Sequence, residues 1–170
     1  MRGIHKMLGL GGVAIVAAVL ASGCIGGAAL GFADGPLEGF PRYGGISPEE
    51  AVSVIVALQD DPDFVLLDIR TPEEVETGHL PGASNLDYRG ASFEQDLGLL
   101  DRNLIYLIYC RTANRTGQAF DLMTQMGFTR IYDMQGGIRR WSELGYPICK
   151  GPLGDEHACV GEYPSLASGV

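Results

Sequence analysis

From residue 47 onward, hydrophobic and polar positions follow helical and strand-like patterns in turn. Ser47 followed by Pro48 and two glutamates is typical of a helix start, and apolar residues then recur at helical spacing as far as Leu58. The continuous apolar run 64–69 lies between turn residues and indicates a buried parallel strand. Residues 71–74 repeat the helix-start pattern, so this region predicts a helix, a strand and a second helix.

The alternation continues to residue 144. A short strand is expected at 83–86 and a helix at 93–100, whereas 104–109 is the most apolar strand candidate and is expected at the centre of the sheet. The remaining expected elements are a helix over 115–126 ended by Gly127, a strand over 130–133, and a helix over 138–144 with Trp141 facing the core. Strands that alternate with helices predict an α/β fold, with a mostly parallel central sheet flanked by helices on both faces.

The N-terminus has a different pattern. Arg2 and Lys6 precede an uncharged apolar stretch that ends in Ala21-Ser22-Gly23-Cys24. A basic start, a short apolar stretch and small residues before a cleavage point are typical of a secretory signal. Small residues directly before a cysteine also resemble the lipobox of prokaryotic lipoproteins. We therefore expect residues 1–23 to be a signal peptide and Cys24 to become the lipidated N-terminus.

Two alternatives remain open for this segment, an uncleaved membrane anchor and simple secretion. Residues 7–33 carry no charge, and about 20 apolar residues suffice to span a bilayer. The glycines within this stretch disfavour a spanning helix, because glycine is a poor helix former. Basic residues at the start favour retention of the N-terminus on the cytoplasmic side of the membrane. We thus expect the domain to be extracytoplasmic, anchored to the outer face of the cell membrane and joined to the anchor by a flexible tether over 24–45.

The net charge of the chain restricts the classes of molecule that it can bind. The chain has 170 residues, with 12 Lys and Arg against 21 Asp and Glu, and a formal net charge of −9. Without residues 1–23 there remain 10 basic and 21 acidic residues, which gives −11. Two lysines and ten scattered arginines cannot assemble a basic face, so nucleic acid is excluded as a partner. Apolar residues make up 46% of the chain, which is enough for a core.

Candidate chemistry follows the expected central strand. Cys110 ends that strand and precedes a short loop and a helix start, at the edge of an α/β sheet where ligands bind. Loop N–H groups and the helix dipole favour an anion there, and so favour a cysteine thiolate over the thiol. Free cysteines are often simply buried in a core, but the flanking Arg111 and Arg115 favour a nucleophile that faces an anion-binding loop.

Three segments resemble motifs of the rhodanese-type sulfurtransferases. Residues 110–115 (Cys-Arg-Thr-Ala-Asn-Arg) are similar to the six-residue active-site loop of that family. Residues 68–83 contain Asp-Ile-Arg and then Gly-His-Leu-Pro-Gly-Ala, similar to the first signature of the family. Residues 136–147, with Gly-Gly-Ile-Arg-Arg-Trp and Gly-Tyr-Pro, are similar to its C-terminal signature. The resemblance implies one rhodanese-like domain, at 46–149, followed by a C-terminal tail at 150–170.

The resemblance also implies a persulfide mechanism. Cys110 would attack a sulfane sulfur donor such as thiosulfate or a persulfide, and would pass the sulfur to cyanide, a thiol or a protein acceptor. Arg111 would orient an anionic donor, because its guanidinium matches oxyanion geometry. Arg115 would brace the loop and share the donor site. The other expected site residues are Thr112, Ala113 and Asn114 in the donor site, and Asp68, Arg70 and Thr116 as supports of the loop.

Other interpretations of these residues stay open. Asp68 and Arg70 could form a surface ion pair at a strand end. A noncatalytic sulfur-binding or signalling module is a second function class, although the intact Cys110 disfavours it. A cysteine phosphatase or arsenate reductase is disfavoured because those enzymes use C-x5-R, whereas residues 110–115 have C-x4-R. No residues have metal-ligand spacing, and no cofactor is expected.

Cys149 and Cys159 lie at and beyond the expected domain end. An oxidising exterior permits disulfides, so we predict a bridge between them that contributes on the order of 3 kcal/mol. Two free thiols, or a pair that relays electrons or sulfur from Cys110, are the alternatives. His157 lies between them, but one histidine and two cysteines are too few for a structural metal site.

Overall fold

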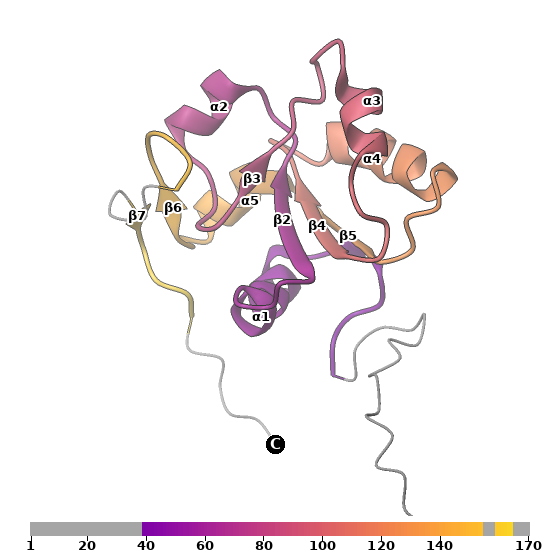
Figure 1. Cartoon of the computed structure of the whole chain (residues 1–170). Helices are drawn as coiled ribbons and strands as arrows, with labels where there is room; N and C mark the ends of the chain where they lie inside the picture. Colours follow the sequence, from indigo (N-terminus) through magenta and orange to yellow (C-terminus); the bar gives the residue numbers. More distant parts are fainter. Residues whose placement is uncertain (1–38, 155–158, 165–170) are drawn as a thin grey trace, which may run out of the picture. The chain divides into compact units, whose positions relative to one another are not determined.

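A parallel sheet forms the centre of the computed structural model, which describes residues 39–154 and 159–164 (Figure 1). Cys24, the expected signal peptide and most of the expected tether lie outside the described residues. The strand order is β1-β5-β4-β2-β3, with every neighbouring pair parallel. The strands are β1 (Gly44–Ile46), β2 (Phe64–Asp68), β3 (Ser84–Asn85), β4 (Ile105–Tyr109) and β5 (Ile131–Met134). Strand β4 is buried along its whole length and lies at the centre, as its apolar sequence predicts.

Helices cover both faces of this sheet. Side chains of α1 and α5 pack on one face and those of α3 and α4 on the other, which confirms the predicted fold class. The helices are α1 (Pro48–Leu58), α2 (Pro72–Thr77), α3 (Phe93–Gly98), α4 (Asn114–Gln125) and α5 (Gly137–Glu143). Both α1 and α2 begin with a complete capping box, as their Ser/Thr-Pro-Glu-Glu starts predict. Within the described residues, no helix is both long enough and apolar enough to cross a membrane.

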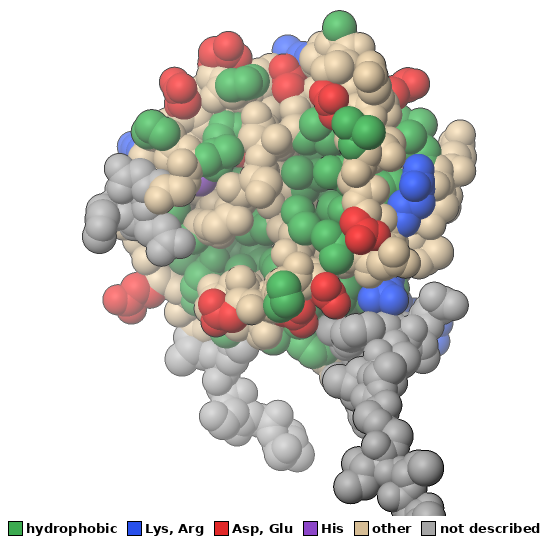
Figure 2. Space-filling view, viewed as in Figure 1, with side chains coloured by type: hydrophobic (Ala, Val, Ile, Leu, Met, Phe, Trp, Pro, Cys, Tyr) green, Lys and Arg blue, Asp and Glu red, His purple; other side chains and the backbone are tan. Residues whose placement is uncertain are grey.

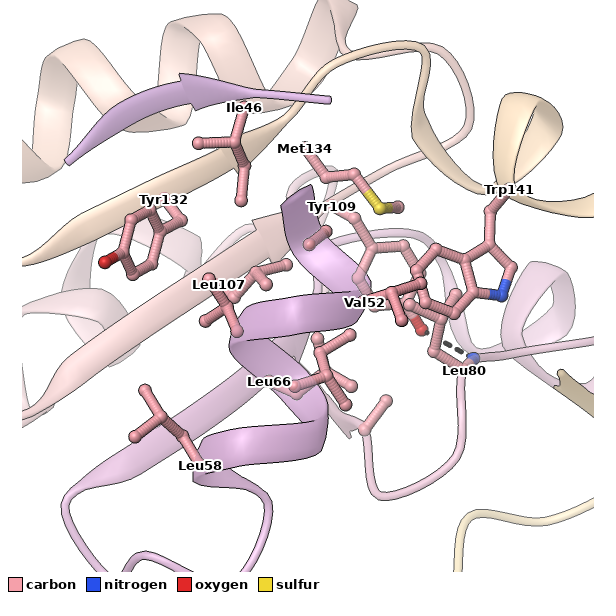
Figure 3. Close-up of a cluster of buried hydrophobic side chains, with 14 of the residues drawn as sticks. Ile46, Val52, Leu58, Leu66, Leu80, Leu107, Tyr109, Tyr132, Met134 and Trp141 are labelled. Carbon is pink, nitrogen blue, oxygen red and sulfur yellow. Dashed lines mark hydrogen bonds between the residues drawn. The ribbon is translucent and has the colours of Figure 1, made fainter. Parts of the chain in front are cut away.

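Two aromatic side chains attach loops to the core beneath α1 and α5 (Figure 3). Trp141 is fully buried, as predicted, and its Nε1 donates to the carbonyl oxygen of Pro147 at 2.8 Å. The buried hydroxyl of Tyr109 accepts a hydrogen bond from the backbone N–H of Leu80 at 3.1 Å. These two bonds satisfy polar groups that burial would otherwise leave unpaired, and they fix the segments around residues 80 and 147 against the sheet.

The ordered domain begins before residue 46, which corrects the expected tether boundary. Residues 44–45 belong to β1 and pair with β5. The ring of Tyr43 packs against that of Tyr132, with centroids 4.9 Å apart, and the Tyr132 hydroxyl donates to the Pro41 carbonyl at 3.3 Å. A three-residue strand that begins with two glycines has no hydrophobic period of its own, so only its partner strand reveals it.

The expected tail at 150–170 also contains structure. Strands β6 (Ile148–Cys149) and β7 (Cys159–Val160) form an antiparallel pair, and a disulfide joins Cys149 to Cys159. Backbone hydrogen bonds link His79 to Cys149 in both directions, at 2.9 and 2.8 Å. Farther along, Tyr163 packs edge-on against Trp141. The disulfide-closed pair is therefore attached to the domain beside the end of α2.

Acidic side chains are spread around the face shown in Figure 2, and the basic side chains on that face form no continuous patch. The excess of acidic residues is thus distributed over this face rather than gathered at one point. Local positive potential must come from particular side chains and backbone dipoles.

Candidate functional site

Cys110 lies at the carboxyl end of the central strand β4, where the loop 111–113 leads into α4. Its side chain is 1% exposed, and its thiol is free. The backbone N–H of Ile138 donates to the Cys110 carbonyl at 2.9 Å, and that of Arg139 donates to the Arg111 carbonyl at 3.2 Å. The start of α5 therefore holds the start of the loop, which explains why the segments around 110 and 137 both carry motif residues.

The loop has a strained residue at its end. Ala113, the residue before α4, has a φ of 73°, and among the described residues it is the only non-glycine with a positive φ. Such a conformation costs about 1–3 kcal/mol for a residue with a side chain, and strain of this kind concentrates at ligand sites. The turn at Ala113 lets the chain pass from β4 into α4 within the four residues 110–113.

The backbone amides of the loop are available to a ligand. The N–H groups of residues 111–116 have no hydrogen-bond acceptor within the described part of the chain, and the first amide with a partner is that of Gly117, bonded to the Ala113 carbonyl at 3.1 Å. Three of these groups belong to the first turn of α4, where the helix dipole adds positive potential. Six consecutive amides without acceptors next to a cysteine are the kind of group that can bind an anion.

Thr116 lies beside Cys110, and the neighbouring strand β5 carries a buried carboxyl group. Its Oγ1 lies 4.0 Å from the Cys110 Sγ and donates to the Ala113 carbonyl at 3.1 Å. Asp133 on β5 is 6% exposed, and its Oδ2 accepts a hydrogen bond from Gln135 at 2.8 Å. Its Oδ1 is buried without a hydrogen-bond partner in the described structure. Burial raises the pKa of Asp133, against the opposing effect of the hydrogen bond from Gln135. The sequence analysis missed Asp133, which stands inside an apolar strand with no motif around it.

Arg115 is paired with Glu74 of α2. Its Nη1 and Nη2 donate to the two carboxylate oxygens of Glu74 at 2.7 and 2.8 Å. Hydrogen bonding to Arg115 lowers the pKa of Glu74 to about 2. Glu74 also accepts a bond from the backbone of Thr71 within the α2 capping box. The guanidinium thus joins α4 to α2, which gives Arg115 the bracing contact expected of it.

Asp68 and Arg70 form a buried pair, so the alternative of a surface ion pair is wrong. Their side chains are 0% and 5% exposed. The guanidinium of Arg70 donates to both carboxylate oxygens of Asp68, and also to the backbone carbonyls of Gly78 at 2.6 Å and Glu74 at 3.1 Å. The pair therefore holds the backbone of α2 at Glu74 and at Gly78, just after the last residue of the helix.

Arg111 borders two hollows in the surface. One hollow, of about 460 Å³, lies over the loop, and it is lined by Thr71, Glu74, Arg89, Arg111, Thr112, Asn114 and Arg115. Arg89 was missed by the sequence analysis because it belongs to no motif. The other hollow, of about 770 Å³, lies between α2, α5 and β6, and Arg111 and Glu74 line it as well. Arg111 is exposed and lies where both hollows meet the loop.

Replacement of Glu74 by glutamine should lower the free energy of unfolding at neutral pH by about 1–2 kcal/mol, because Arg115 loses a charged partner. The lowered pKa of Glu74 means that its contribution to stability is fully present above the unfolded-state pKa, near 4.5, and is lost as the pH falls towards about 2. The difference between variant and wild type in urea unfolding should therefore shrink at acid pH.

Glu50→Gln is the matched control for this measurement. Glu50 occupies the same capping-box position in α1, but within the described structure it is not paired with an arginine. Glutamine also serves in a capping box, so this change should have little effect on stability. An equal loss in both variants would show that the cap, and not the Arg115 pair, is responsible.

Comparison with known proteins places the chain among sulfur-handling proteins. The family model described as the rhodanese-like domain matches residues 52–144. A sulfurtransferase from Allochromatium vinosum is 34% identical over 99 residues, which are 58% of this chain and 91% of the relative. The thiosulfate sulfurtransferase PspE from Escherichia coli is 27% identical over 85 residues, 50% of this chain and 78% of the relative. A rhodanese-related protein from Thermoplasma volcanium superimposes with a TM-score of 0.52 at 26% identity, covering 62% of this chain and 97% of its own.

Proposed function

The chain belongs to the family of rhodanese-like domains, and from this premise we propose that it transfers sulfane sulfur through a persulfide on Cys110. The observation that carries the proposal is the row of six backbone amides, 111–116, beside the Cys110 thiol. These N–H groups suit the negative charge that the reaction places on sulfur at Cys110, first on the thiolate and then on the persulfide. Relatives named thiosulfate sulfurtransferases support thiosulfate as one donor.

The first half-reaction loads the sulfur. The Cys110 thiolate attacks the outer sulfur of thiosulfate, the bond between the two thiosulfate sulfurs breaks, and its electron pair leaves with sulfite. The enzyme then holds Cys–S–S⁻, so the total charge is unchanged. Arg111 is exposed at the mouth of the loop and suits the oxyanions of the donor. Arg89 lines the same hollow and adds a second cation.

The second half-reaction transfers the sulfur from Cys110 to the acceptor. A nucleophilic acceptor such as cyanide attacks the outer sulfur, and the electron pair of the S–S bond returns to Cys110 as the thiolate. Two successive displacements predict ping-pong kinetics. The loop amides stabilise the anion in each resting form, which requires the loop to keep its shape between the two steps.

Mass spectrometry tests the loaded intermediate directly. Incubation of the protein with thiosulfate, followed by digestion, should add one sulfur atom (about 32 Da) to the Cys110 peptide, and cyanide should remove it as thiocyanate. Sulfur on another residue, or turnover without a Cys110 adduct, would contradict the mechanism.

We also propose that the chain is a lipoprotein, lipidated at Cys24 and held outside the cytoplasmic membrane. The signal-like N-terminus supports the proposal, as does the disulfide between Cys149 and Cys159, because disulfides persist in oxidising compartments. Cys24→Ala should move the protein out of the membrane fraction. A variant that stayed in that fraction would favour an uncleaved anchor instead.

A further inference from the structure

The larger hollow beside the loop, the cleft between α2, α5 and β6, exceeds what a small inorganic sulfur donor requires. Its volume of about 770 Å³ lies within the range of sites that hold small organic molecules. Arg111 and Glu74 line both this cleft and the hollow over the loop, so the two spaces are adjacent. Ile138 and Ile148 give the cleft apolar surface as well. The cleft therefore suits an organic molecule that reaches towards Cys110.

The charges in the cleft favour an anionic ligand. Arg70 is neutralised by Asp68, and Glu74 by Arg115. Glu143 lies 3.7 Å from Arg139 and 3.4 Å from Arg140, both exposed. No described residue forms a hydrogen bond or ion pair with the side chain of Arg111 or Lys150. Two cations without a partner among the described residues thus line one cleft of a chain whose formal charge is −9.

The position of Lys150 is fixed by the disulfide-closed pair of strands. It directly follows Cys149, and the next residue, Gly151, donates its backbone N–H to the Glu76 carbonyl of α2 at 3.0 Å. The backbone of Lys150 is therefore held on both sides. Lys150 also lies beyond the residues 52–144 that the family model matches. This wall of the cleft is a feature of this chain in addition to the matched domain.

We propose that the cleft binds a low-molecular-weight thiol that carries carboxylate groups, or the persulfide of such a thiol, with Lys150 as the residue that selects it. This inference rests on the proposed function and names its organic substrate class. A carboxylate of the ligand pairs with Lys150, its carbon chain lies along Ile138 and Ile148, and its sulfur passes Arg111 towards Cys110. In the transfer, the thiolate RS⁻ attacks the outer sulfur of Cys–S–S⁻. The S–S bond breaks, its electron pair goes to Cys110 as the thiolate, and RS–S⁻ leaves, so the total charge is unchanged.

Binding of a probe that cannot react separates this inference from the proposed function. S-methylglutathione carries two carboxylates and no free thiol, and calorimetry of the full chain should detect it at millimolar concentrations, with Cys110→Ser binding as well as wild type does. Lys150→Glu should weaken this binding about tenfold, since the change removes one exposed ion pair and adds repulsion. Added salt should weaken binding to the wild type.

Arg42→Glu is the control, because it makes the same change of charge at an exposed residue before β1, at the opposite end of the parallel strands from Cys110. In the transfer assay, Lys150→Glu should lower the ratio of kcat/KM for glutathione to that for cysteamine about tenfold, whereas Arg42→Glu should leave the ratio as in wild type.

Each result decides between the two proposals. Failure of the wild type to bind S-methylglutathione, an equal loss for both acceptors in Lys150→Glu, or an equal change of the ratio in Arg42→Glu would overturn the assignment of the cleft. Binding that Lys150→Glu weakens, in a protein that transfers no sulfur to any acceptor, would uphold the site and overturn the proposed function.

Discussion

Replacement of Cys110 by serine should reduce thiocyanate formation from thiosulfate and cyanide by about a thousandfold or more, because the reaction then has no nucleophile that can carry the sulfur. A serine hydroxyl is not ionised near neutral pH and cannot form a persulfide. The row of amides at 111–116 would remain and could still bind the donor, but binding without covalent transfer leaves the sulfur on thiosulfate.

The measurement is the rate of thiocyanate formation, with the mass of the Cys110 peptide as a second readout. The side chain is 1% exposed, so a thermal unfolding curve must show that the serine variant is folded under the assay conditions. Sulfur transfer that survived in the variant would refute the mechanism. Hydrolysis of an aryl phosphate by the wild type, without sulfur transfer, would instead favour a cysteine phosphatase.

Local sequence signals were enough to predict the long elements. Strand β4 is a run of apolar residues that is buried at every position, and α1 and α2 each start with a capping box that the sequence shows directly. Of the two- and three-residue strands in the described part of the chain, only β3 falls within a predicted strand, 83–86. Residues 44–46 and the pairs 148–149 and 159–160 are strands because of partners elsewhere in the chain, not because of a hydrophobic period.

The candidate site likewise has features that the sequence predicts and features that only the structure shows. The strand end, the loop and the helix start pointed to Cys110 and Arg111 without a structure, because they are consecutive in sequence. The pair of Arg115 with Glu74 joins residues 41 positions apart, and Asp133 is buried on the neighbouring strand β5. Nothing in the sequence around Glu74 or Asp133 indicates this ion pair or this burial. Sequence thus locates the nucleophile, and the structure locates what holds its loop.

Three elements brace the loop, and each does so through a different interaction. Helix α2 holds Arg115 through Glu74, α4 holds the Ala113 carbonyl through the hydroxyl of Thr116, and α5 binds the carbonyls of Cys110 and Arg111 through its first amides. Amides can stabilise an anion only where they are oriented in advance, since any reorientation takes free energy from the stabilisation. Of the three braces, the one from α5 has the least room for change.

Gly137→Ala should disrupt that brace, with a loss of about 4 kcal/mol in the free energy of unfolding. Gly137 has a φ of 60°, in the region that disfavours side chains, and an added Cβ would meet the Cys110 carbonyl oxygen and lie 2.6 and 2.7 Å from the Arg111 carbonyl carbon and oxygen. All three are backbone atoms of the loop, so α5 and the loop cannot move apart without shifting the loop amides of residues 111–116. We expect sulfur transfer to fall at least tenfold even at temperatures where the variant is folded.

Gly117→Ala is the matched control for Gly137→Ala, because Gly117 lies in the first half of α4, also close to Cys110 in sequence. A Cβ there would have no atom within 4 Å, and its φ is not positive. Alanine favours a helix over glycine, so this variant should gain about 0.5–1 kcal/mol in urea unfolding and keep its activity. If Gly137→Ala instead behaved like Gly117→Ala in both measurements, α5 could not be the support that orients the loop, and the bracing of Cys110 would have to rest on Glu74 and Thr116.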